Sequence, residues 1–314
     1  MKHANPERSG QLAENVAIAL RFKKSQGTPA MPQVEKEVLA ANYDRVRGGN
    51  FHLASNARDQ DWAHPGMYLR NAFPDRVDVM EQVIADGDRV GLLFRVTGTH
   101  TGAFFGIAPT GRRIDVYEIA WLVIRNGQMV EGWFMMDEIA LLKQLGVKLP
   151  ARADGRIITP PVAAGGDDIA TAVKQLTAQS SPLAKNKIVL AQSRAEHHGG
   201  VRASGHSTLR NGFHHLRAYS KAQGLGEFDV DKAVHGRVDR VEAMMAEGDM
   251  VWMRFNTGGT HSGSHAGIAP TGKRVGVNVA MLARFDKGQW VESWTFADEM
   301  GFLLQVGQPN LLLP

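Results

Sequence analysis

The stretch GIAPTGRRI at residues 106–114 returns as GIAPTGKRV at residues 267–275. The similarity extends well beyond these nine positions, because residues 86–146 align with 247–307 without a gap at an offset of 161. In that alignment 26 of the 61 positions are identical, which indicates a duplication rather than a chance match. The chain therefore contains two copies of one domain.

Two shorter similarities outside this run bear on how each copy begins. Residues 38–49 resemble 189–200 at an offset of 151, which predicts that each copy begins with a helix. The pentapeptides LRNAF (69–73) and LRNGF (209–213) indicate a further correspondence at an offset of 140.

The segment between the two copies reads as a linker. Residues 149–168, LPARADGRIITPPVAAGGDD, are rich in Pro, Gly and Ala and show neither helical nor strand periodicity. We therefore assign residues 1–32 to an N-terminal extension, 33–148 to the first domain and 169–314 to the second.

The repeated segment is predicted to form strands followed by a helix. The dipeptide Asn126-Gly127 between β-prone runs is a strong hairpin signal, and Lys287-Gly288 replaces it in the second copy. A helix is expected over residues 137–145, with Gly146 ending it. The predicted strands of the first copy are residues 89–100, 114–125 and 129–135.

The composition is typical of a folded globular protein, with 43% hydrophobic and 22% charged residues. The net charge of +4 is mildly basic, but Lys and Arg are scattered and aromatic residues are only 7%, so no nucleic-acid partner is predicted. Cysteine is absent, which excludes disulfides and thiolate sites and leaves the redox compartment open. Since no signal-peptide core or apolar run of membrane-spanning length is present, we expect a cytoplasmic protein without membrane contact.

The G-x-x-x-x-G-K spacing from Gly267 to Lys273 resembles a phosphate-binding loop, but its context does not fit. Such a loop needs Ser or Thr after the Lys, and a helix whose N-terminal amides face the phosphate. Arg274 follows here, and the next residues alternate as in a strand. We interpret the stretch as a turn between strands and expect no nucleotide or other cofactor.

Eight of the twelve histidines lie between residues 197 and 265. No acidic residue completes a recognisable ligand frame with them, so no metal site is predicted. His100 and His261 occupy equivalent positions of the repeat. Each is interpreted either as a structural hydrogen-bond partner within a sheet or as a pocket residue.

The pattern E-x-W-x-x-x-D occurs in both copies, at residues 131–137 and 292–298. On a strand, Glu131 and Trp133 share a face, and Asp137 follows where strand becomes helix. A carboxylate beside a large aromatic ring is partly desolvated, which raises its pKa and suits it to proton transfer near neutrality. The alternative is that this Asp, or its counterpart Asp298, simply caps the following helix.

The sequence resembles the SnoaL-like polyketide cyclase family, within the nuclear transport factor 2-like superfamily. The matching segments of the first copy are AFPDRVDVMEQVIADGDRV, GTHTGAFFGIAPTGRRI and NGQMVEGWFMMDEIALLKQLG. Those of the second copy are AEGDMV, GTHSGSHAGIAPTGKRV and KGQWVESWTFADEMGFLLQVG. The resemblance covers most of residues 38–146 and 188–307.

The resemblance implies two tandem α+β domains, each a cone-shaped barrel with a curved mixed sheet around N-terminal helices and a deep apolar pocket. It also implies cofactor-independent chemistry, in which family cyclases close a ring by intramolecular aldol condensation. The family's Asp after the tryptophan corresponds to Asp137 and Asp298. The family also includes isomerases, hydrolases, lyases and non-catalytic binders, so the fold alone does not decide the function.

The first copy is expected to hold the working pocket, because it keeps more of the family's residues. There Asp137 is expected to carry the proton and His100 to hydrogen-bond the developing oxyanion, with Asp298 and His261 as counterparts in the second copy. The side chains expected to shape the pocket are those of Trp62, His64, Phe104, Tyr117, Trp133 and, in the second copy, Trp294.

We therefore expect a general acid-base enzyme that acts on a small, largely apolar carbonyl compound by aldol-type cyclisation, retro-aldol cleavage, isomerisation or hydration. The alternative is a non-catalytic module that binds an apolar ligand or assembles through its sheets. The two copies are expected to pack as a pseudo-symmetric pair within the chain. Further homo-oligomerisation stays open.

Overall fold

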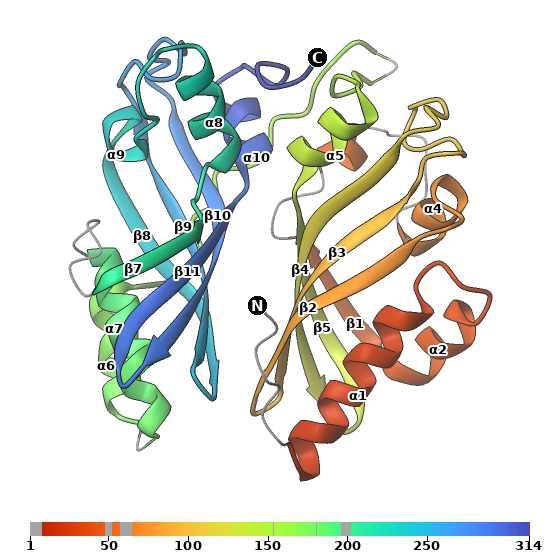
Figure 1. The fold of residues 1–314 in the computed structure, drawn as a ribbon, viewed down its shortest axis with the longest axis vertical. Coiled ribbons are helices and arrows are strands. Elements are labelled where there is room, and N and C mark those ends of the chain that lie inside the picture. The colour runs from red at the N-terminus through yellow and green to blue at the C-terminus, as the bar shows by residue number, and fades with distance from the viewer. Residues whose placement is uncertain (1–7, 48–51, 57–64, 153, 180, 196–201) are drawn as a thin grey trace. The chain divides into compact units, whose positions relative to one another are not determined.

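The computed structural model describes residues 8–47, 52–56, 65–152, 154–179, 181–195 and 202–314. The chain divides into two compact units (Figure 1). The first domain comprises residues 1–158 with 313–314, and the second comprises residues 159–312. The division falls inside the segment 149–168 that is interpreted as a linker. Each domain is described by itself below.

The first domain is an α+β unit with one mixed sheet in the strand order β1-β5-β4-β3-β2. Strand β1 pairs with β5 in parallel, and all other neighbours are antiparallel. Its strands are β1 (Leu39–Arg47), β2 (Val77–Asp86), β3 (Arg89–Thr99), β4 (Arg113–Arg125) and β5 (Gln128–Met136). Its helices are α1 (Gly10–Ser25), α2 (Met31–Val38), α3 (His52–Asn56), α4 (Pro65–Ala72) and α5 (Glu138–Leu145).

The second domain repeats this plan with the strand order β6-β8-β9-β10-β11-β7. Here β7 pairs with β11 in parallel, as β1 does with β5. Its strands are β6 (Asp167–Asp168), β7 (Arg202–Arg210), β8 (Val234–Glu247), β9 (Met250–His261), β10 (Arg274–Asp286) and β11 (Gln289–Ala297). Its helices are α6 (Ile169–Thr177), α7 (Pro182–Ala195), α8 (His214–Ala222), α9 (Val230–Ala233) and α10 (Glu299–Gln305).

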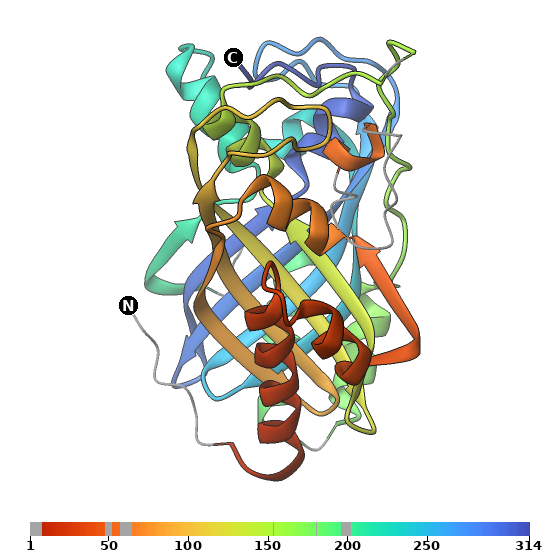
Figure 2. The same ribbon diagram turned by 90° about the vertical axis from the view of Figure 1, so that its right-hand side faces the viewer.

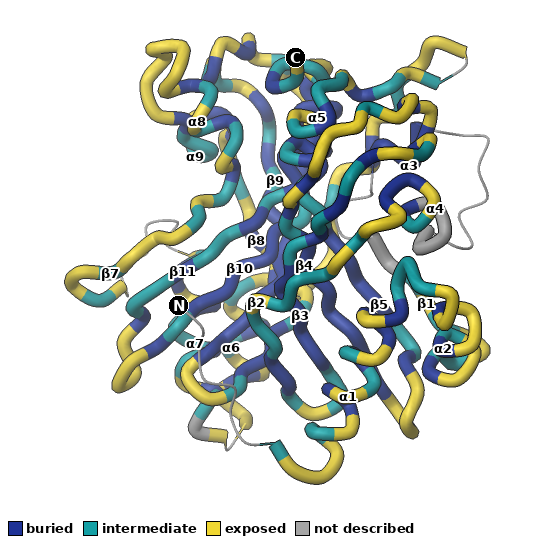
Figure 3. The backbone as a smooth tube through the Cα atoms, turned by 45° about the vertical axis from the view of Figure 1, so that its right-hand side comes forward, coloured by how far each residue is buried: buried dark blue, intermediate teal, exposed yellow. Residues whose placement is uncertain are grey.

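Each sheet carries its N-terminal helices on one face. Helix α1 packs against β2 and β3, and α2 packs against β5, so both helices cover the first sheet (Figure 2). Helix α7 covers β8 and β9 in the second domain. Buried residues concentrate on the inner strands, which are apolar along most of their length (Figure 3). Because α1 contributes to this packing, residues 10–25 form part of the first domain rather than an appendage to it.

The strands predicted within the repeat are confirmed to within one residue at each end. Asn126 and Gly127 have φ of 51° and 75°, the positive values that a two-residue hairpin turn requires. The helix expected after Asp137 begins at Glu138 and ends at Gly146, which has φ of 71°. The stretch 106–112 is a turn that leads into β4, as the sequence predicts.

Each domain begins with helices, as predicted, but residues 39–47 do not belong to them. Residues 39–47 form β1, whereas the similar residues 189–195 lie in α7. Strand β1 pairs in parallel with β5, and β7 pairs in parallel with β11, the strand equivalent to β5. Strand β7 is therefore the counterpart of β1. The short sequence similarity therefore joined a strand to a helix, since local identity does not fix the tertiary pairing that selects between them.

The proposed correspondence of LRNAF with LRNGF is also wrong. The Gly102 N–H donates to the carbonyl of Ala72, which ends α4, at 3.2 Å. The Gly263 N–H donates to the carbonyl of Ala233, which ends α9, at 3.1 Å. Helix α9 is therefore the counterpart of α4 at the common offset of 161.

Two identical residues of the repeat hold the last helix of each domain in place. The carboxylate of Glu138 accepts the backbone N–H groups of His52 and Leu53 at 2.9 and 2.8 Å. Glu299 accepts those of His215 and Leu216 at 3.0 and 2.9 Å. Each carboxylate thus satisfies free amides near the start of α3 or α8, which accounts for the repeated Asp-Glu dipeptide.

Candidate functional site

Each domain buries an Arg-x-Asp motif at equivalent positions. The motif lies at the start of β2 in the first domain and within β8 in the second. Arg76 and Asp78 belong to the first domain, and Arg237 and Asp239 lie at the same offset of 161 in the second. The Arg76 guanidinium donates to Asp78 from Nε and Nη2, at 2.8 and 3.0 Å. A strand places residues i and i+2 on one face, so this spacing directs both side chains to the same side of the sheet.

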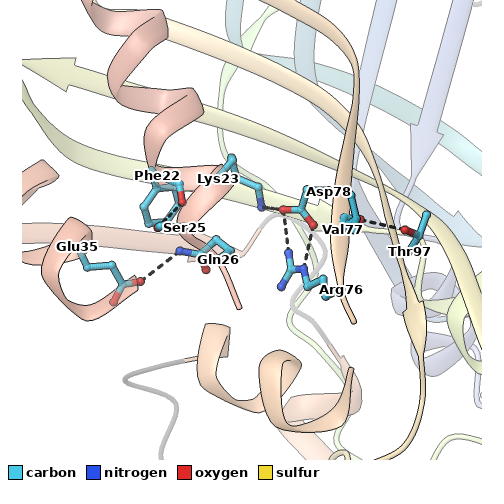
Figure 4. Close-up of polar contacts among 9 residues, drawn as sticks. All are labelled: Phe22, Lys23, Ser25, Gln26, Glu35, Arg76, Val77, Asp78 and Thr97. Atoms are coloured by element: carbon cyan, nitrogen blue, oxygen red, sulfur yellow. Dashed lines mark hydrogen bonds and ion pairs between the residues drawn. The ribbon is translucent and has the colours of Figure 1, made fainter. Parts of the chain in front are cut away.

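A cation from the N-terminal helix completes each cluster. In the first domain Lys23 on α1 brings its Nζ to 3.1 Å from Asp78 Oδ2, as Figure 4 shows. In the second, Arg194 on α7 donates from Nε to Asp239 Oδ2 at 2.7 Å. The two domains therefore build clusters from equivalent Arg and Asp residues, although Arg237 lies 4.0 Å from Asp239 and only 2.8 Å from Asp231.

A phenylalanine at equivalent positions lies beneath each of these cations. The Lys23 Nζ lies 4.0 Å from the centre of the Phe94 ring, and the Arg194 guanidinium lies 4.7 Å from that of Phe255. Burial lowers the pKa of Lys23, and the charges of Asp78 and Glu118 oppose that shift. Burial lowers the pKa of Arg237 in the same way, with Asp239 opposing it. These charges stay buried because each has a partner of opposite sign.

A cavity of about 430 Å³ opens over this cluster in the second domain. Its volume lies in the range typical of small-molecule sites, about 300–1,000 Å³. The cationic residues Arg194 and Arg237 lie at its wall with Phe255. Its other apolar walls are formed by Phe213, Phe228, Val279 and Met281.

Among the described residues of the first domain, the equivalent place holds a cavity of only about 20 Å³. Glu118 and Phe134 line it, and the residues at those positions in the second domain are Val279 and Thr295. The smaller side chains leave the space that Glu118 and Phe134 fill. The working pocket is expected in the first copy, whereas the larger cavity among the described residues lies in the second.

The cavity of the second domain carries more positive than negative side chains. Arg217 pairs with Glu227 at 2.6 Å, and Arg237 Nε lies 2.8 Å from Asp231 Oδ1. Arg202 instead lies over the Trp290 ring at 4.8 Å. Burial, and then the charge of Arg194, lower the pKa of Arg202. Its charged residues are Arg194, Arg202, Arg217, Lys232 and Arg237 against Glu227, Asp229 and Asp231.

Asp137 and Asp298 both act as helix N-caps. The Ala140 N–H donates to Asp137 Oδ1 at 3.0 Å, and the Gly301 N–H donates to Asp298 Oδ1 at 2.8 Å. The capping alternative left open by the sequence is therefore realised in both domains. Asp298 directly follows Ala297, which lines the cavity, but is not itself among the described lining residues.

His100 and His261 lock the repeated turn in place. His100 Nδ1 accepts the backbone N–H of Thr110 at 3.2 Å and lies 3.0 Å from its hydroxyl. His261 makes the same two contacts with Thr271, at 3.3 and 3.0 Å. Burial lowers the pKa of both rings, which favours the neutral form whose Nδ1 can accept. The same histidine contacts therefore hold the Pro-Thr-Gly turn in both copies.

The described aromatic residues expected to shape the pocket lie elsewhere. Trp133 and Tyr117 are strand neighbours of Phe134 and Glu118, so they lie on the opposite face of the sheet. Phe104 packs against Phe73 with ring centres 5.3 Å apart. In the second domain Trp294 neighbours the cavity residue Thr295 and likewise belongs to the other face. Trp62 and His64 lie outside the described residues.

Sequence reasoning missed the Arg-x-Asp cluster, although a signal was present. Arg76-Val77-Asp78 and Arg237-Val238-Asp239 are identical at the same offset of 161. Extending the repeat ten residues towards the N-terminus would have found them.

The described residues were also compared with the requirements for a metal site and for a membrane-spanning helix. In that part of the chain, no group of three or more His, Cys, Asp or Glu side chains is arranged to hold a metal ion. No helix there combines the length and the apolar character needed to cross a membrane.

Comparison with solved structures gives partial matches. A protein assigned as a SnoaL-like polyketide cyclase, from Jannaschia sp. CCS1, is 21% identical, with a TM-score of 0.39, covering 45% of this chain and 97% of that one. AclR of Streptomyces galilaeus, assigned as a hydroxylase, is 26% identical, with a TM-score of 0.35, covering 43% and 98%. IdmH of Streptomyces antibioticus, assigned as a polyketide cyclase, is 23% identical, with a TM-score of 0.36, covering 44% and 100%.

The family model of the SnoaL-like polyketide cyclases matches residues 64–145 and 227–306, which together make up slightly more than half of the chain. No curated protein matches. One match falls in each domain, over the Arg-x-Asp motif and the strands that follow it. The chain therefore belongs to the SnoaL-like polyketide cyclase family, with two tandem copies of the family's domain.

Proposed function

We propose that the second domain is the working unit of a cofactor-independent acid-base enzyme that acts on a small, largely apolar carbonyl compound. The observation that carries this proposal is the cavity of about 430 Å³ with the arginine-carboxylate cluster in its wall. Aldol-type cyclisation, retro-aldol cleavage, isomerisation and hydration all share one requirement. Negative charge develops on a carbonyl oxygen, and a nearby group moves the proton.

The arginines of the cavity suit the first part of that requirement. Removal of a proton next to a carbonyl places negative charge on the oxygen, and fixed cations near that oxygen stabilise it. Arg194 and Arg237 are held by Asp239 and Asp231, so their guanidinium groups need little reorganisation when the charge appears. The apolar side chains in the wall lower the local dielectric constant and so strengthen the attraction.

Asp231 is the carboxylate that we assign to proton transfer. It lines the cavity, and its Oδ1 lies 2.8 Å from Arg237 Nε. Its side chain is 36% exposed, so a substrate can reach it. A carbonyl oxygen on Arg237 would bring the neighbouring C–H group towards Asp231, since only one bond separates the two carbon atoms.

A ring closure in this site balances without an added reagent. The Asp231 carboxylate takes the proton from carbon, and the enolate carbon bonds to the carbon of a second carbonyl in the same molecule. The alkoxide that forms takes the proton back from Asp231. Asp298 is the other candidate for this role, because the family resemblance points to it.

The experiment measures deuterium exchange next to a carbonyl by NMR, with 2-tetralone as an apolar ketone in deuterated buffer. The protein should accelerate the exchange, and Asp231→Asn should slow it about 10²–10⁴-fold with an unchanged melting temperature. The control is Arg76→Gln in the first domain, which should leave exchange unchanged. Binding of the ketone without accelerated exchange would instead support the non-catalytic ligand-binding module.

A further inference from the structure

The two cavities differ at one charged position that lies directly beside the cation. Glu118 pairs across strands β3 and β4 with Phe94, the ring under Lys23. Val279 pairs in the same way with Phe255, the ring under Arg194. Cross-strand partners project from one face with Cβ atoms about 4.5–5.5 Å apart. Position 279 therefore faces Arg194 as position 118 faces Lys23.

Glu118 supplies negative charge to the cluster of the first domain. It is buried, with 3% of its surface exposed, and lines the small cavity together with Lys23 and Arg76. Its charge acts on Lys23 directly, raising the pKa of that amine against the effect of burial. The two cations of this cluster thus face two carboxylates, those of Asp78 and Glu118.

The second domain also has two cations in its cluster, but it has no carboxylate at the position of Glu118. Arg194 pairs with Asp239 and Arg237 pairs with Asp231, whereas Val279 provides no charge beside Arg194. Arg202 adds a further cation close enough to Arg194 to have its pKa lowered. The cavity lining nevertheless holds five cationic side chains against three carboxylates, so it favours a ligand that brings a negative charge.

Thr257 is a second, independent indication of a polar ligand. It lines the cavity at the position that Val96 occupies in the first domain. The residue is 5% exposed, and among the described residues its hydroxyl has no hydrogen-bond partner. Buried hydroxyl groups are normally hydrogen-bonded, so this one is available to a bound molecule.

We propose that the ligand of the second domain carries a carboxylate that takes the place of the Glu118 carboxylate. Arg194 binds this group, the Thr257 hydroxyl donates to it, and the apolar body fills the space left by Thr295. The natural substrate class is then a keto acid rather than a neutral ketone. In the first domain the Glu118 side chain provides the equivalent carboxylate. This inference rests on the proposed function only for the choice of cavity.

The test compares 2-naphthoate with 2-naphthamide, which has nearly the same shape without the charge, by isothermal titration calorimetry. The naphthoate should bind at least about tenfold more tightly, because hydrogen bonds between charged groups are roughly twice as strong as those between neutral groups. Val279→Glu should remove this preference by placing a carboxylate beside Arg194. The matched control Val279→Gln fills the same space without charge and should weaken naphthoate binding much less.

The inference is overturned if the amide binds as tightly as the acid, or if naphthoate shows no saturable binding up to millimolar concentration. Equal losses in Val279→Glu and Val279→Gln would also overturn it. Thr257→Val should weaken naphthoate several-fold and leave the amide nearly unchanged. Failure of the proposed function is seen separately, as bound naphthoate without accelerated exchange of 2-tetralone. If exchange is accelerated but the acid is not preferred, the inference of a ligand carboxylate is refuted and the proposed function stands.

Discussion

The two domains share several contacts that hold the fold together and differ at side chains that face the cavity. Both contain the Arg-x-Asp cluster, the glutamate that caps a helix and the histidine that locks the Pro-Thr-Gly turn. They differ at Glu118 and Phe134 against Val279 and Thr295. The arginine, aspartate, glutamate and histidine residues that make these shared contacts are identical in the two copies, and their partners lie within the protein. The differing pairs lie where we propose that the ligand binds.

The largest effect on stability and on ligand binding is expected when the cavity of the first domain is enlarged. Glu118→Val with Phe134→Thr gives the first cavity the residues of the second. Since large-to-small changes in a core cost about 2–5 kcal/mol, the free energy of unfolding should fall by several kcal/mol. The folded variant should bind a second equivalent of 2-naphthoate in calorimetry.

A folded double variant that still binds one equivalent would show that these two positions do not account for the difference between the domains. The reverse pair, Val279→Glu with Thr295→Phe, serves as the matched control. It should remove the single equivalent that the wild type binds.

The histidine locks predict a pH dependence that both domains share. Burial holds the pKa of His100 and of His261 below the ordinary value of 6.5. As the pH falls through 6.5, the unfolded chain therefore takes up protons that the folded protein does not, and stability is lost. Each histidine contributes at most about 1.4 kcal/mol per pH unit between 6.5 and its folded pKa.

Urea unfolding between pH 7.5 and 5.5 measures this slope. The double variant His100→Asn with His261→Asn keeps an acceptor for the threonine amide and should show a smaller slope than the wild type. The other histidines remain in both proteins, so their contribution cancels in the difference. Equal slopes would mean that the two rings do not set the pH dependence.

The smallest effects are expected at the two helix caps. Asn is as good an N-cap as Asp, so Asp137→Asn and Asp298→Asn should change stability by only a few tenths of a kcal/mol. The Ala variants should each cost about 1 kcal/mol in thermal or urea unfolding. Exchange of 2-tetralone adds the functional readout. A hundredfold loss in Asp298→Asn at an unchanged melting temperature would transfer the proton-carrier role from Asp231 to Asp298.

Much of the fold could be predicted from the sequence because the repeat and the hairpin turn are local signals. The Asn126-Gly127 turn and the cap of α5 are set by neighbours in the sequence, and the structure shows both as predicted. The similarity of residues 38–49 to a segment of α7 did not reveal strand β1, because the place of this strand depends on parallel pairing with β5, about 90 residues away.

The candidate site was harder to predict, for two physical reasons. The partner of Asp78 is Lys23, which lies on a helix outside the repeated segment and reaches the sheet only in the folded protein. The E-x-W-x-x-x-D pattern indicates that Trp133 and Glu131 share a face but not which face of the sheet it is. Phe134, the neighbour of Trp133, is the residue that faces the cavity.

Phe213 forms part of the cavity wall, and the helix that follows it is held by a residue outside the cavity. It lines the cavity with φ of 54° and ψ of 44°, an unfavourable backbone geometry for a bulky side chain. The next residues, His214 to Leu216, begin α8, and Glu299 on α10 holds two of their amides. A protein engineer could therefore retune ligand selectivity by substitutions on the C-terminal helix, leaving every ligand-contacting side chain unaltered.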